Sequence, residues 1–592
     1  MYAPGAHHDR NPTVPEVEPR PAVLPEAAPP PPRTLLGILR ETVSAHPGQA
    51  AVDDGTRRLT YRELSAEVEA GAQRLRTLGI GVGDRVGIRI PSGTARLYVA
   101  ILSVLAAGAA YVPVEADDPP ARAERVWTEA QVCAVLEAGG TTRLREGTPP
   151  RSVTGVPGPD DDAWVIFTSG TSGRPKGVAI SHRAAAAFVD AEARVFLPTA
   201  PLGPGDRVLA ALSVAFDASC EEMWLAWRHG ACLVPAPRVL VRSGADIAPW
   251  LRERRVTVVS TVPTLAEQWP DAAYAGVRLL IVGGETCPSA LARRLVAGVA
   301  AGGEVWNIYG PTEATVGCSA ARLTAEDTVR IGLPLDGWRL AVVDASLQRV
   351  GWGETGELVI GGVGLGRYLD PVLDAERFAP AQGWPRAYRT GDLVRAEEAG
   401  LVYVGRADDQ VKIRGHRIEP EEIAALLTAH PLVRQAHVRA FDDGDGPYLV
   451  AYAVTGSQNT TELRSYLAAN LATAMRPRSI VPLAALPLLG SGKLDLAGLP
   501  APAPQTPVRI APREDLPDAP AAVEEIVTAT WCEVLNVAHV DRDENFFDIG
   551  GHSMLLIKVQ RRLSERFNRR IPAVDLFAYP TVRTMTTYLS KG

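Results

Sequence analysis

Short apolar runs alternate with helical stretches along most of the chain. The runs Arg85–Ile90, Leu279–Gly284 and Glu357–Gly362 have the length and composition of buried strands, and stretches rich in Ala, Leu and Arg separate them. This alternation predicts an α/β architecture of sheets covered by helices. We expect a large α/β domain over residues 34–407 and a smaller α/β domain over residues 408–499.

The two ends of the chain depart from this pattern. Residues 1–33 consist largely of Pro, Ala and charged residues, which bury too little apolar surface to fold, so we expect a disordered leader. Residues 500–520 hold seven prolines and are typical of a semi-rigid linker. In the last segment, residues 521–592, apolar positions recur on one helix face and predict an all-helical domain. These positions are Val523, Ile526, Val527, Trp531 and Val534.

One uncharged stretch raises the question of a membrane. Residues 97–114 run for 18 residues without a charge, which just reaches the length of a membrane span. The stretch is rich in Ala and Gly, contains Pro113 and divides at Gly108, so we favour a buried helix followed by a short strand over a membrane span. No signal peptide precedes it. We therefore expect a cytoplasmic protein with no membrane segment in this chain.

Composition narrows the classes of function. A chain of 592 residues with 46% hydrophobic and 22% charged residues is ordinary for a globular protein of several domains. The formal charge of −7 provides no basic surface, so we expect no nucleic-acid partner. The six cysteines form no CxxC pair and no metal-ligand spacing, and we interpret them as small buried residues in a reducing compartment.

The first candidate for chemistry is the sequence IFTSGTSGRPKG at residues 166–177. An apolar run enters a loop of hydroxyl residues and glycines, a composition that presents N–H and O–H donors to phosphate oxygens, and Lys176 adds a mobile cation. The loop is not a Walker loop, because Lys176 lies between Pro175 and Gly177. A flexible surface loop is the alternative on composition alone. The candidate phosphate contacts are Thr168, Ser169, Gly170, Thr171, Ser172, Gly173 and Lys176.

Further motifs follow in a fixed order. They are YGPTE at 309–313, YRTGDL at 388–393 and GSGKLD at 490–495. With the loop, they make residues 34–499 resemble the adenylate-forming superfamily, which comprises acyl-CoA ligases, luciferases and the adenylation domains of nonribosomal peptide synthetases. The resemblance implies a large core domain and a small mobile C-terminal subdomain, both α/β, and an ATP-dependent, AMP-forming ligase.

The resemblance also implies roles for residues of these motifs. Tyr309 would pack on adenine, Asp392 would accept hydrogen bonds from the ribose, and Glu313 would hold Mg²⁺, which commonly takes few protein carboxylates when it bridges phosphates. Taken alone, Asp392 has a turn-capping Asp as its alternative. Further nucleotide contacts are implied at Gly284, Glu285, Asn307, Gly310, Thr312 and Tyr403.

Two further assignments concern the smaller domain. Gly405, Arg406 and Asp408 match the hinge motif of the superfamily, with Arg406 reaching the nucleotide and Asp408 acting as the pivot. Lys493 matches the catalytic lysine, which bridges the substrate carboxylate and the α-phosphate and stabilises the negative charge that develops there. A lone Gly-Lys pair would otherwise be an ordinary surface feature.

The sequence DIGGHS at 548–553 resembles the thiolation motif of peptidyl carrier proteins. Ser553 starts a helix predicted over residues 553–567, whose positive end favours an attached phosphate, although a Ser at this place could also be an ordinary helix cap. The resemblance implies a four-helix carrier domain over residues 521–592, with 4′-phosphopantetheine on Ser553 added by a phosphopantetheinyl transferase. The preceding linker would keep the thiol at high effective concentration.

The sequence FDASCEEM at 216–223 bears on the substrate. In amino-acid-activating members its Asp, here Asp217, binds the α-ammonium, which argues for an amino acid and against an aryl or fatty acid. Glu221 falls where many members place an apolar side chain. A buried carboxylate is costly unless it meets a cation, so we expect Glu221 to bind a side-chain ammonium. The alternative is a neutral substrate with Glu221 turned to solvent.

The remaining wall of this pocket is implied by the resemblance. We expect Ala218, Gly283 and Gly317 to leave room there. The full set of implied positions is Asp217, Ala218, Glu221, Ser260, Ile281, Gly283, Ile308, Val316, Gly317 and Lys493.

Residues 216–238 also resemble the adenylation domains of cationic homopolymer synthetases, the family of ε-poly-L-lysine synthetase. This implies L-lysine as substrate, with ornithine, 2,4-diaminobutyrate or β-lysine as alternatives, and downstream condensation or polymerising domains as partners. An accessory activator protein is left open, as is whether the chain is the cytoplasmic part of a membrane-anchored synthetase. A free-standing acyl-CoA ligase and a catalytically silent scaffold are the rival functions.

Overall fold

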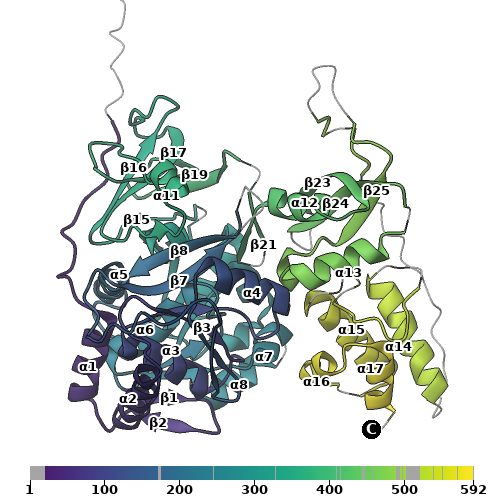
Figure 1. Cartoon of the computed structure of the whole chain (residues 1–592), viewed down its shortest axis with the longest axis horizontal. Coiled ribbons are helices and arrows are strands. Elements are labelled where there is room, and N and C mark those ends of the chain that lie inside the picture. The colour runs from purple at the N-terminus through teal and green to yellow at the C-terminus, as the bar shows by residue number, and fades with distance from the viewer. Residues whose placement is uncertain are drawn as a thin grey trace, which may run out of the picture.

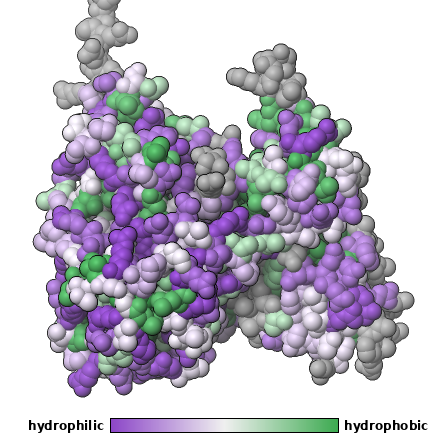
Figure 2. Space-filling view, viewed as in Figure 1, coloured by the Kyte–Doolittle hydropathy of each residue, from purple (hydrophilic) through white to green (hydrophobic). Residues whose placement is uncertain are grey.

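The computed structural model of the chain has three parts (Figure 1). The core domain, at the left of the figure, is followed by the small domain at the upper right and by a helical domain below it. The structure describes residues 21–590 except 171–174, 245, 327, 409, 414, 443–446, 458, 488–493, 497, 502–519, 536, 538, 548, 550, 552 and 570. Figure 2 shows the hollow between the upper parts of the core and small domains.

The core domain contains two large sheets whose central strands are parallel. Across the nine-stranded sheet the order is β15 (Leu333–Pro334), β14 (Ser319–Arg322), β13 (Glu304–Tyr309), β12 (Leu279–Gly283), β11 (Val258–Thr261), β9 (Arg207–Ala210), β10 (Cys232–Pro235), β1 (Ala50–Asp53) and β2 (Arg58–Thr60). Across the seven-stranded sheet it is β18 (Arg367–Tyr368), β8 (Lys176–Ser181), β7 (Asp162–Thr168), β4 (Ala110–Pro113), β3 (Arg85–Arg89), β5 (Ala134–Glu137) and β6 (Thr142–Leu144).

A four-stranded antiparallel sheet completes the core domain. Its strands are β16 (Trp338–Val343), β17 (Thr355–Gly362), β19 (Tyr388–Arg395) and β20 (Val402–Arg406). The strands predicted at residues 85–90, 279–284 and 357–362 are thereby confirmed as β3, β12 and part of β17.

Helices cover the two large sheets and also separate them. They are α1 (Leu35–Ala45), α2 (Tyr61–Thr77), α3 (Ala95–Ala107), α4 (Pro120–Glu129), α5 (His182–Val195), α6 (Ala218–His229), α7 (Arg238–Ser243), α8 (Ile247–Glu253), α9 (Pro263–Gln268), α10 (Ser289–Gly298) and α11 (Pro371–Arg377), with 3₁₀ turns η1 (Asp271–Ala273) and η2 (Thr312–Ala314). Helix α5 contacts β7 and β8 of one sheet, α6 contacts β9, β10 and β11 of the other, and the two helices contact each other. Helix α6 therefore lies in the interior, and residues 219–227 are all buried.

The uncharged stretch at residues 97–114 forms the predicted helix and strand. Helix α3 ends at Gly108, whose φ of 98° is readily adopted by glycine, and β4 follows at once. Among the residues that the structure describes, none of the helices has the length and apolar character needed to cross a bilayer.

The prediction that residues 1–33 form a disordered leader is wrong for residues 21–33. Ala22 and Leu24 are buried in the core, and the Ala22 N–H donates to the Val350 carbonyl at 2.8 Å. Arg33 binds Asp190 of α5 through two hydrogen bonds of 2.8 and 2.5 Å. Two apolar side chains and a paired guanidinium therefore hold an otherwise proline-rich segment against the domain. Residues 1–20 lie outside the described part of the chain.

The small domain has a three-stranded sheet and a separate hairpin. The elements in chain order are β21 (Val411–Ile413), β22 (His416–Ile418), α12 (Pro420–Thr428), β23 (Val433–Asp442), β24 (Pro447–Thr455), α13 (Thr461–Asn470), η3 (Thr473–Met475) and β25 (Ser479–Leu483). Ile413 and Ile418 of the β21–β22 hairpin share one apolar cluster with Ala451 and Ala453 of β24. Val450 and Tyr452 alternate with these along the strand and belong to a different cluster, as the two-residue period of a strand requires.

The described residues of the C-terminal domain form four helices, which confirms the predicted helical fold. They are α14 (Pro520–Leu535), α15 (Ser553–Arg566), α16 (Ala573–Ala578) and α17 (Val582–Leu589). Val523, Val527 and Trp531 are buried in its core, and Ile526 and Val534 pack against that core, as the helical period predicted.

Candidate active site

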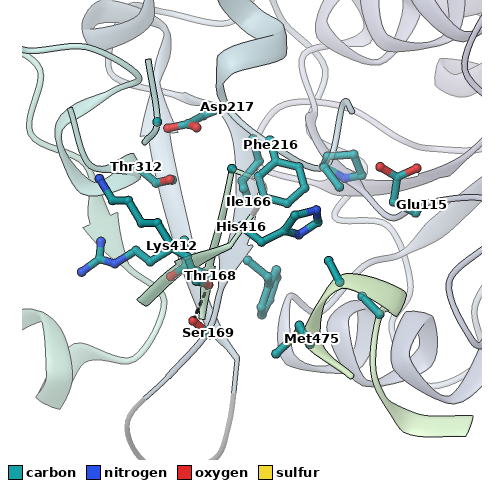
Figure 3. A pocket seen from close by; sticks show the side chains of 18 of the residues that line it. Glu115, Ile166, Thr168, Ser169, Phe216, Asp217, Thr312, Lys412, His416 and Met475 are labelled. Atoms are coloured by element: carbon teal, nitrogen blue, oxygen red, sulfur yellow. Dashed lines mark hydrogen bonds between the residues drawn. The ribbon is translucent and has the colours of Figure 1, made fainter. Parts of the chain in front are cut away.

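Two adjoining cavities lie where the domains meet. The first has a volume of about 160 Å³ and is lined by β7, η2, β19 and the β21–β22 hairpin. The second has a volume of about 200 Å³ and is lined by α6, by the ends of β11, β12 and β13, by the hairpin and by the helical domain. Asp217, Gly284 and His416 line both. Figure 3 shows the first cavity, with Thr168, Thr312 and Lys412 on one side and Met475 of the small domain on another.

The predicted phosphate loop closes the hairpin of β7 and β8, in which Thr168 pairs with Lys176. The Thr168 hydroxyl is buried, with no hydrogen-bond partner in the described structure, and Thr168 lines the first cavity. Ser169 instead contacts the small domain, because its hydroxyl donates to the Arg417 carbonyl at 2.7 Å and accepts the Glu419 N–H at 3.1 Å. The Gly170 N–H donates to Glu422 at 3.3 Å. Thr171, Ser172 and Gly173 lie outside the described residues.

Lys176 is also held by the small domain. Its ammonium lies 3.7 Å from the Glu419 carboxylate, and its side chain is only 9% exposed. Burial lowers the pKa of Lys176, and Glu419 and Glu313 oppose this effect. In this arrangement the small domain supplies the counter-charge of the loop lysine.

A chain of polar contacts joins the adenine and ribose candidates to the hinge. The Tyr309 hydroxyl donates to Asp392, and Arg406 donates to the other oxygen of Asp392 at 2.7 Å. Arg406 also forms two 2.6 Å hydrogen bonds with Asp408, which is half exposed at the junction of the domains. The structure therefore brings these four predicted residues together, and Asp392 and Arg406 line the first cavity.

Lys412 is a site residue that the sequence reasoning missed. Its ammonium lies 5.5 Å from the centre of the Tyr309 ring and 5.9 Å from that of Tyr403, and it lines the first cavity. Burial lowers the pKa of Lys412, while Asp392 favours its charged form. Its position in the polar sequence at 405–422 suggested a domain boundary, and nothing there pointed to a group inside the site.

Both carboxylate oxygens of Glu313, the implied metal ligand, have partners in this arrangement. Its side chain is 1% exposed, one oxygen lies 3.0 Å from Arg417, and the other accepts the Tyr368 hydroxyl at 2.6 Å. Burial acts to raise the pKa of Glu313, but Arg417 and Tyr368 outweigh it and hold the pKa below its usual range. No cluster of three or more metal-ligating side chains occurs among the residues described. An ionised carboxylate is a suitable Mg²⁺ ligand, but in this arrangement both of its oxygens are engaged by Arg417 and Tyr368.

The other implied nucleotide contacts divide into two groups. Gly284, Gly310 and Thr312 line the first cavity, and a side chain at Gly310 would meet the Val316 carbonyl at 2.4 Å. Glu285 accepts hydrogen bonds from the backbone and hydroxyl of Thr264 at 2.9 and 2.7 Å and from the Gly415 N–H. Asn307 donates to the Arg330 carbonyl at 2.8 Å and lines neither cavity.

Asp217 stands at the start of α6, on the boundary between the cavities. Its Oδ2 atom is buried and has no hydrogen-bond partner in the described structure. Burial raises the pKa of Asp217 to about 6, against hydrogen bonds from Thr312 and from the backbone of Ala218 and Val316. An orphan carboxylate oxygen in this position suits an ammonium group of a ligand.

Glu221 lies deeper in the second cavity and is 1% exposed. The alternative in which it turns to solvent is therefore excluded. The Ser260 hydroxyl donates to its Oε2 at 2.5 Å, while its Oε1 has no partner in the described structure. Ala218, Gly283, Ile308 and Val316 also line this cavity, whereas Ile281 and Gly317 are buried outside its lining.

The room expected at two glycines is already filled. A Cβ added at Gly283 would lie 2.7 Å from the Ile308 side chain, and one at Gly317 would lie 2.5 Å from it. Ile308 therefore occupies the space beside both glycines, and that prediction is wrong. The glycines allow the isoleucine to pack closely and do not widen the pocket.

The second cavity reaches the helical domain. Phe547 lines it together with Thr473 and Ala474 of the small domain and Gln268 of the core domain. Helices α15 and α16 contact α7 of the core domain. Ser553 is the first residue of α15, as predicted, and its side chain is outside the described structure. A cavity that leads from this domain towards Asp217 fits a long flexible arm attached near the start of α15.

Lys493 lies outside the described residues, but its neighbours are placed. Leu486 and Leu499 pack with Val450 and Tyr452, on the face of the small sheet opposite to the β21–β22 hairpin. The hairpin, which lines both cavities through His416, therefore faces the site in this structure.

Comparisons with known proteins fit this geometry. Residues 39–368 match the family described as AMP-binding enzyme, residues 422–493 its C-terminal domain, and residues 525–589 the phosphopantetheine attachment site. Syringomycin synthase SyrB1 of Pseudomonas syringae pv. syringae is 34% identical over 597 residues, covering 94% of this chain and 96% of that protein. Phosphinothricin tripeptide synthetase PhsC of Streptomyces viridochromogenes is 36% identical over 588 residues, covering 94% of this chain. The chain spans 53% of PhsC and 7% of another curated relative, CymA of Salinispora arenicola.

Solved structures agree on the fold. Holo-PA1221, a nonribosomal peptide synthetase protein with adenylation and carrier domains, superposes with a TM-score of 0.75 at 24% identity, covering 94% of this chain and 96% of that one. A four-domain synthetase, holo-AB3403 bound to AMP and glycine, has a TM-score of 0.59 at 29% identity and covers 96% of this chain and 43% of that one.

The chain belongs to the AMP-binding enzyme family. It joins an AMP-forming, amino-acid-activating adenylation domain, made of the core and small domains, to a phosphopantetheine carrier domain, the pairing found in nonribosomal peptide synthetases.

Proposed function

We propose that this chain activates a cationic amino acid, with L-lysine as the first candidate, and loads it onto its own carrier domain. The observation that carries the proposal is the buried Glu221 carboxylate, which has an unpartnered oxygen in the same cavity as the unpartnered oxygen of Asp217. Two such carboxylates suit a substrate with two ammonium groups, because a buried charge needs a counter-charge. Asp217 binds the α-ammonium and Glu221 the side-chain ammonium.

In the first half-reaction a carboxylate oxygen of the amino acid attacks the α-phosphorus of ATP, and pyrophosphate leaves. Lys493 and Lys176 stabilise the negative charge that develops, the hydroxyl of Thr168 donates to phosphate oxygens, and Asp392 with Arg406 positions the ribose. Glu313 would hold Mg²⁺, which would neutralise phosphate charge. Thr171, Ser172 and Gly173 of the phosphate loop are further candidates for contacts with the triphosphate.

The second half-reaction uses the domain arrangement described here. The small domain turns about Asp408, which removes Lys493 from the site and brings in the β21–β22 hairpin with Lys412 and Arg417. Phosphopantetheine on Ser553 supplies the thiol that receives the aminoacyl group, and AMP leaves. The cavity between Phe547 and Asp217 supports this route.

The longer assembly is also a proposal. A phosphopantetheinyl transferase modifies Ser553, and condensation or polymerising domains take the loaded residue into a cationic homopolymer or peptide. Resemblance at residues 216–238 supports lysine, with ornithine, 2,4-diaminobutyrate and β-lysine as the alternatives, since one methylene changes binding by only roughly 1–3 kcal/mol.

The test is ATP–pyrophosphate exchange with the proteinogenic amino acids and these three additional diamino acids, for wild type and Glu221→Gln. We expect one cationic substrate to dominate, and Glu221→Gln to lower its kcat/KM by roughly a hundredfold or more. The matched control is Glu222→Gln, because Glu222 accepts the N–H groups of Ala211 and Leu212 and does not line the cavity. It should leave the ranking of substrates unchanged. Preference for a neutral amino acid would overturn the proposal.

A further inference from the structure

The turn that leads into α12 brings a buried carboxylate to the candidate phosphate loop. Glu419 occupies the N-cap position of α12, yet its side chain makes no capping hydrogen bond. Glu is not among the residues that usually cap a helix, and a carboxylate that is only 2% exposed needs partners elsewhere. Those partners lie in the core domain and near the β21–β22 hairpin, and they allow an acidic residue to be buried here.

Three groups of the phosphate loop contact this part of the small domain. The Lys176 ammonium lies 3.7 Å from the Glu419 carboxylate, and the two side chains are 9% and 3% exposed. The Ser169 hydroxyl, labelled in Figure 3, donates to a backbone carbonyl of β22 at 2.7 Å and accepts the Glu419 N–H at 3.1 Å. The Gly170 N–H donates to the Glu422 carboxylate at 3.3 Å. An ammonium, a hydroxyl and an N–H group are donors that a phosphate-binding loop offers its ligand, so the small domain takes up these donors in the arrangement seen here.

Glu419 is held in place from its own domain. The side-chain amide of Gln410 donates to the Glu419 carboxylate, and Arg417 donates to the amide oxygen of Gln410 at 2.5 Å. The Gln410 N–H donates to the hinge residue Asp408 at 3.3 Å. The carboxylate is therefore fixed relative to the hinge and the hairpin, and its contact with Lys176 depends on where the small domain lies.

Glu419 and a phosphate group are alternative partners of Lys176. The Lys176 side chain is nearly buried, so it needs a counter-charge, and Glu419 provides it. Pyrophosphate in the loop would provide the same counter-charge and would compete for the donors of Ser169 and Gly170. If both were present, several anions would share one cation in a poorly hydrated site, and their repulsion would favour the loss of one of them.

We infer that Glu419 is a positioning residue for carrier loading that takes the place of a phosphate group at Lys176, so that docking of the small domain in the position seen here and binding of pyrophosphate exclude each other. The inference rests on the proposed function, which assigns the loop to the triphosphate, and deepens it. Pyrophosphate then has to leave before the aminoacyl group is transferred, and free pyrophosphate inhibits loading without any reversal of the first half-reaction. An ion pair that only joins two domains would be indifferent to pyrophosphate.

The first test measures binding of magnesium pyrophosphate to the full chain by calorimetry. Exclusion is reciprocal, so a change that weakens docking strengthens pyrophosphate binding. Glu419→Gln removes the charge and keeps the shape of the side chain, and we expect it to lower the Kd of pyrophosphate roughly fivefold or more. Glu421→Gln is the matched control, because Glu421 lies in the first turn of α12 and is exposed, and it should leave the Kd within about twofold of wild type.

The second test measures single-turnover loading from supplied aminoacyl-AMP on the full chain bearing phosphopantetheine, with the amino acid that exchange selects. All proteins carry Lys493→Ala, which blocks reversal on the proposed mechanism, and chromatography of the nucleotides verifies that pyrophosphate forms no ATP. We expect pyrophosphate to inhibit loading in this parent protein. Adding Glu419→Gln should slow loading roughly tenfold in the absence of pyrophosphate and make it sensitive to lower pyrophosphate concentrations, whereas Glu421→Gln should match the parent.

Several results would overturn the inference. A folded Glu419→Gln protein that loads slowly but binds pyrophosphate no more tightly than wild type would reduce Glu419 to a domain contact, and one that also loads at the parental rate would remove it from loading altogether. Loading in the parent protein that is insensitive to pyrophosphate would disprove the exclusion, and this result does not depend on the folding of the Glu419 variant. If Lys493→Ala abolishes loading, the calorimetric comparison decides.

Failure of this inference is distinguishable from failure of the proposed function. If wild type catalyses exchange with a cationic amino acid while Glu419→Gln leaves the Kd of pyrophosphate unchanged, the proposed function survives and only the role of Glu419 is lost. Absence of exchange with every amino acid tested would instead refute the proposed function.

Discussion

The guanidinium of Arg417 lies 3.0 Å from the carboxylate of Glu313, and the two residues belong to different domains. Glu313 is deeply buried, so it needs a cation whenever the small domain occupies the position seen here. Arg417 provides that cation in this arrangement. If the small domain turns as we propose, Arg417 would leave with its hairpin and the same carboxylate would become free to hold Mg²⁺, so the two cations would belong to different stages of the cycle.

Arg417→Met should slow loading of the carrier domain and leave pyrophosphate exchange largely intact. The substitution leaves Glu313 unpaired in the docked arrangement, at a cost of roughly 3–5 kcal/mol, and so disfavours docking. Single-turnover transfer of labelled amino acid to the carrier, set beside exchange, measures the two halves separately. Arg417→Lys keeps the charge and serves as the control, and an equal loss of both activities in the Met variant would contradict the assignment.

Lys493→Ala and Lys412→Ala should impair opposite halves of the reaction. Lys493 is assigned to adenylate formation, so its loss should abolish exchange but permit loading from supplied aminoacyl-AMP. Lys412 reaches the site only through the docked hairpin, so its loss should reduce loading more than exchange. Loss of the same half-reaction in both variants would disprove the division of roles.

Amino-acid activation should weaken below about pH 6. Binding of the α-ammonium needs ionised Asp217, whose pKa burial raises to about 6, so protonation removes the counter-charge as the pH falls. The measurement is kcat/KM for the amino acid in pyrophosphate exchange from about pH 5 to about pH 8. A flat profile over the acidic half of this range would show that Asp217 does not hold the substrate ammonium.

Ser553→Ala should eliminate covalent loading and leave exchange unchanged, because the substitution removes only the attachment point of phosphopantetheine. Phe547→Ala should retain the attachment but slow loading, since Phe547 forms part of the cavity wall between the carrier and core domains. Mass spectrometry of the intact chain distinguishes modified from unmodified protein. Loading of the Ser553→Ala protein at the wild-type level would refute the carrier assignment.

Leu24→Ala should destabilise the core domain by roughly 2–3 kcal/mol, although the residue lies in a proline-rich segment. The neighbouring Val23 is 62% exposed, and Val23→Ala provides a matched control that should change stability little. Urea unfolding followed by tryptophan fluorescence compares the two. Equal stability of both variants would show that burial of Leu24 contributes nothing to the stability of the core domain.

Much of the fold and site could be predicted because its signals are local in sequence. The β7–β8 loop and the Asp217 turn place their groups within a few residues of a strand or helix end, and the α/β alternation follows from apolar periodicity. Contacts between domains have no such signal. Lys412 and Arg417 lie in one polar stretch, and only the docked hairpin shows that both enter the site.

Tertiary packing also determines features of the fold and site that composition alone could not predict. From the missing side chains of Gly283 and Gly317 we expected free space in the pocket wall. The side chain of Ile308 packs against both glycines and occupies that space. The leader was expected to be disordered from its prolines, yet Ala22 and Leu24 give residues 21–33 enough apolar contact to be held.

The cavity lined by Phe547, His416 and Asp217 has walls from all three domains, and this affects how the enzyme protects its own product. An aminoacyl-adenylate is a mixed anhydride that water destroys, and closing a site excludes water from it. On the proposed mechanism the carrier domain, which contributes Phe547 to the cavity wall, would both accept the aminoacyl residue and help to shield the adenylate from water. A core domain without its carrier would accordingly release more free amino acid and AMP for each ATP consumed.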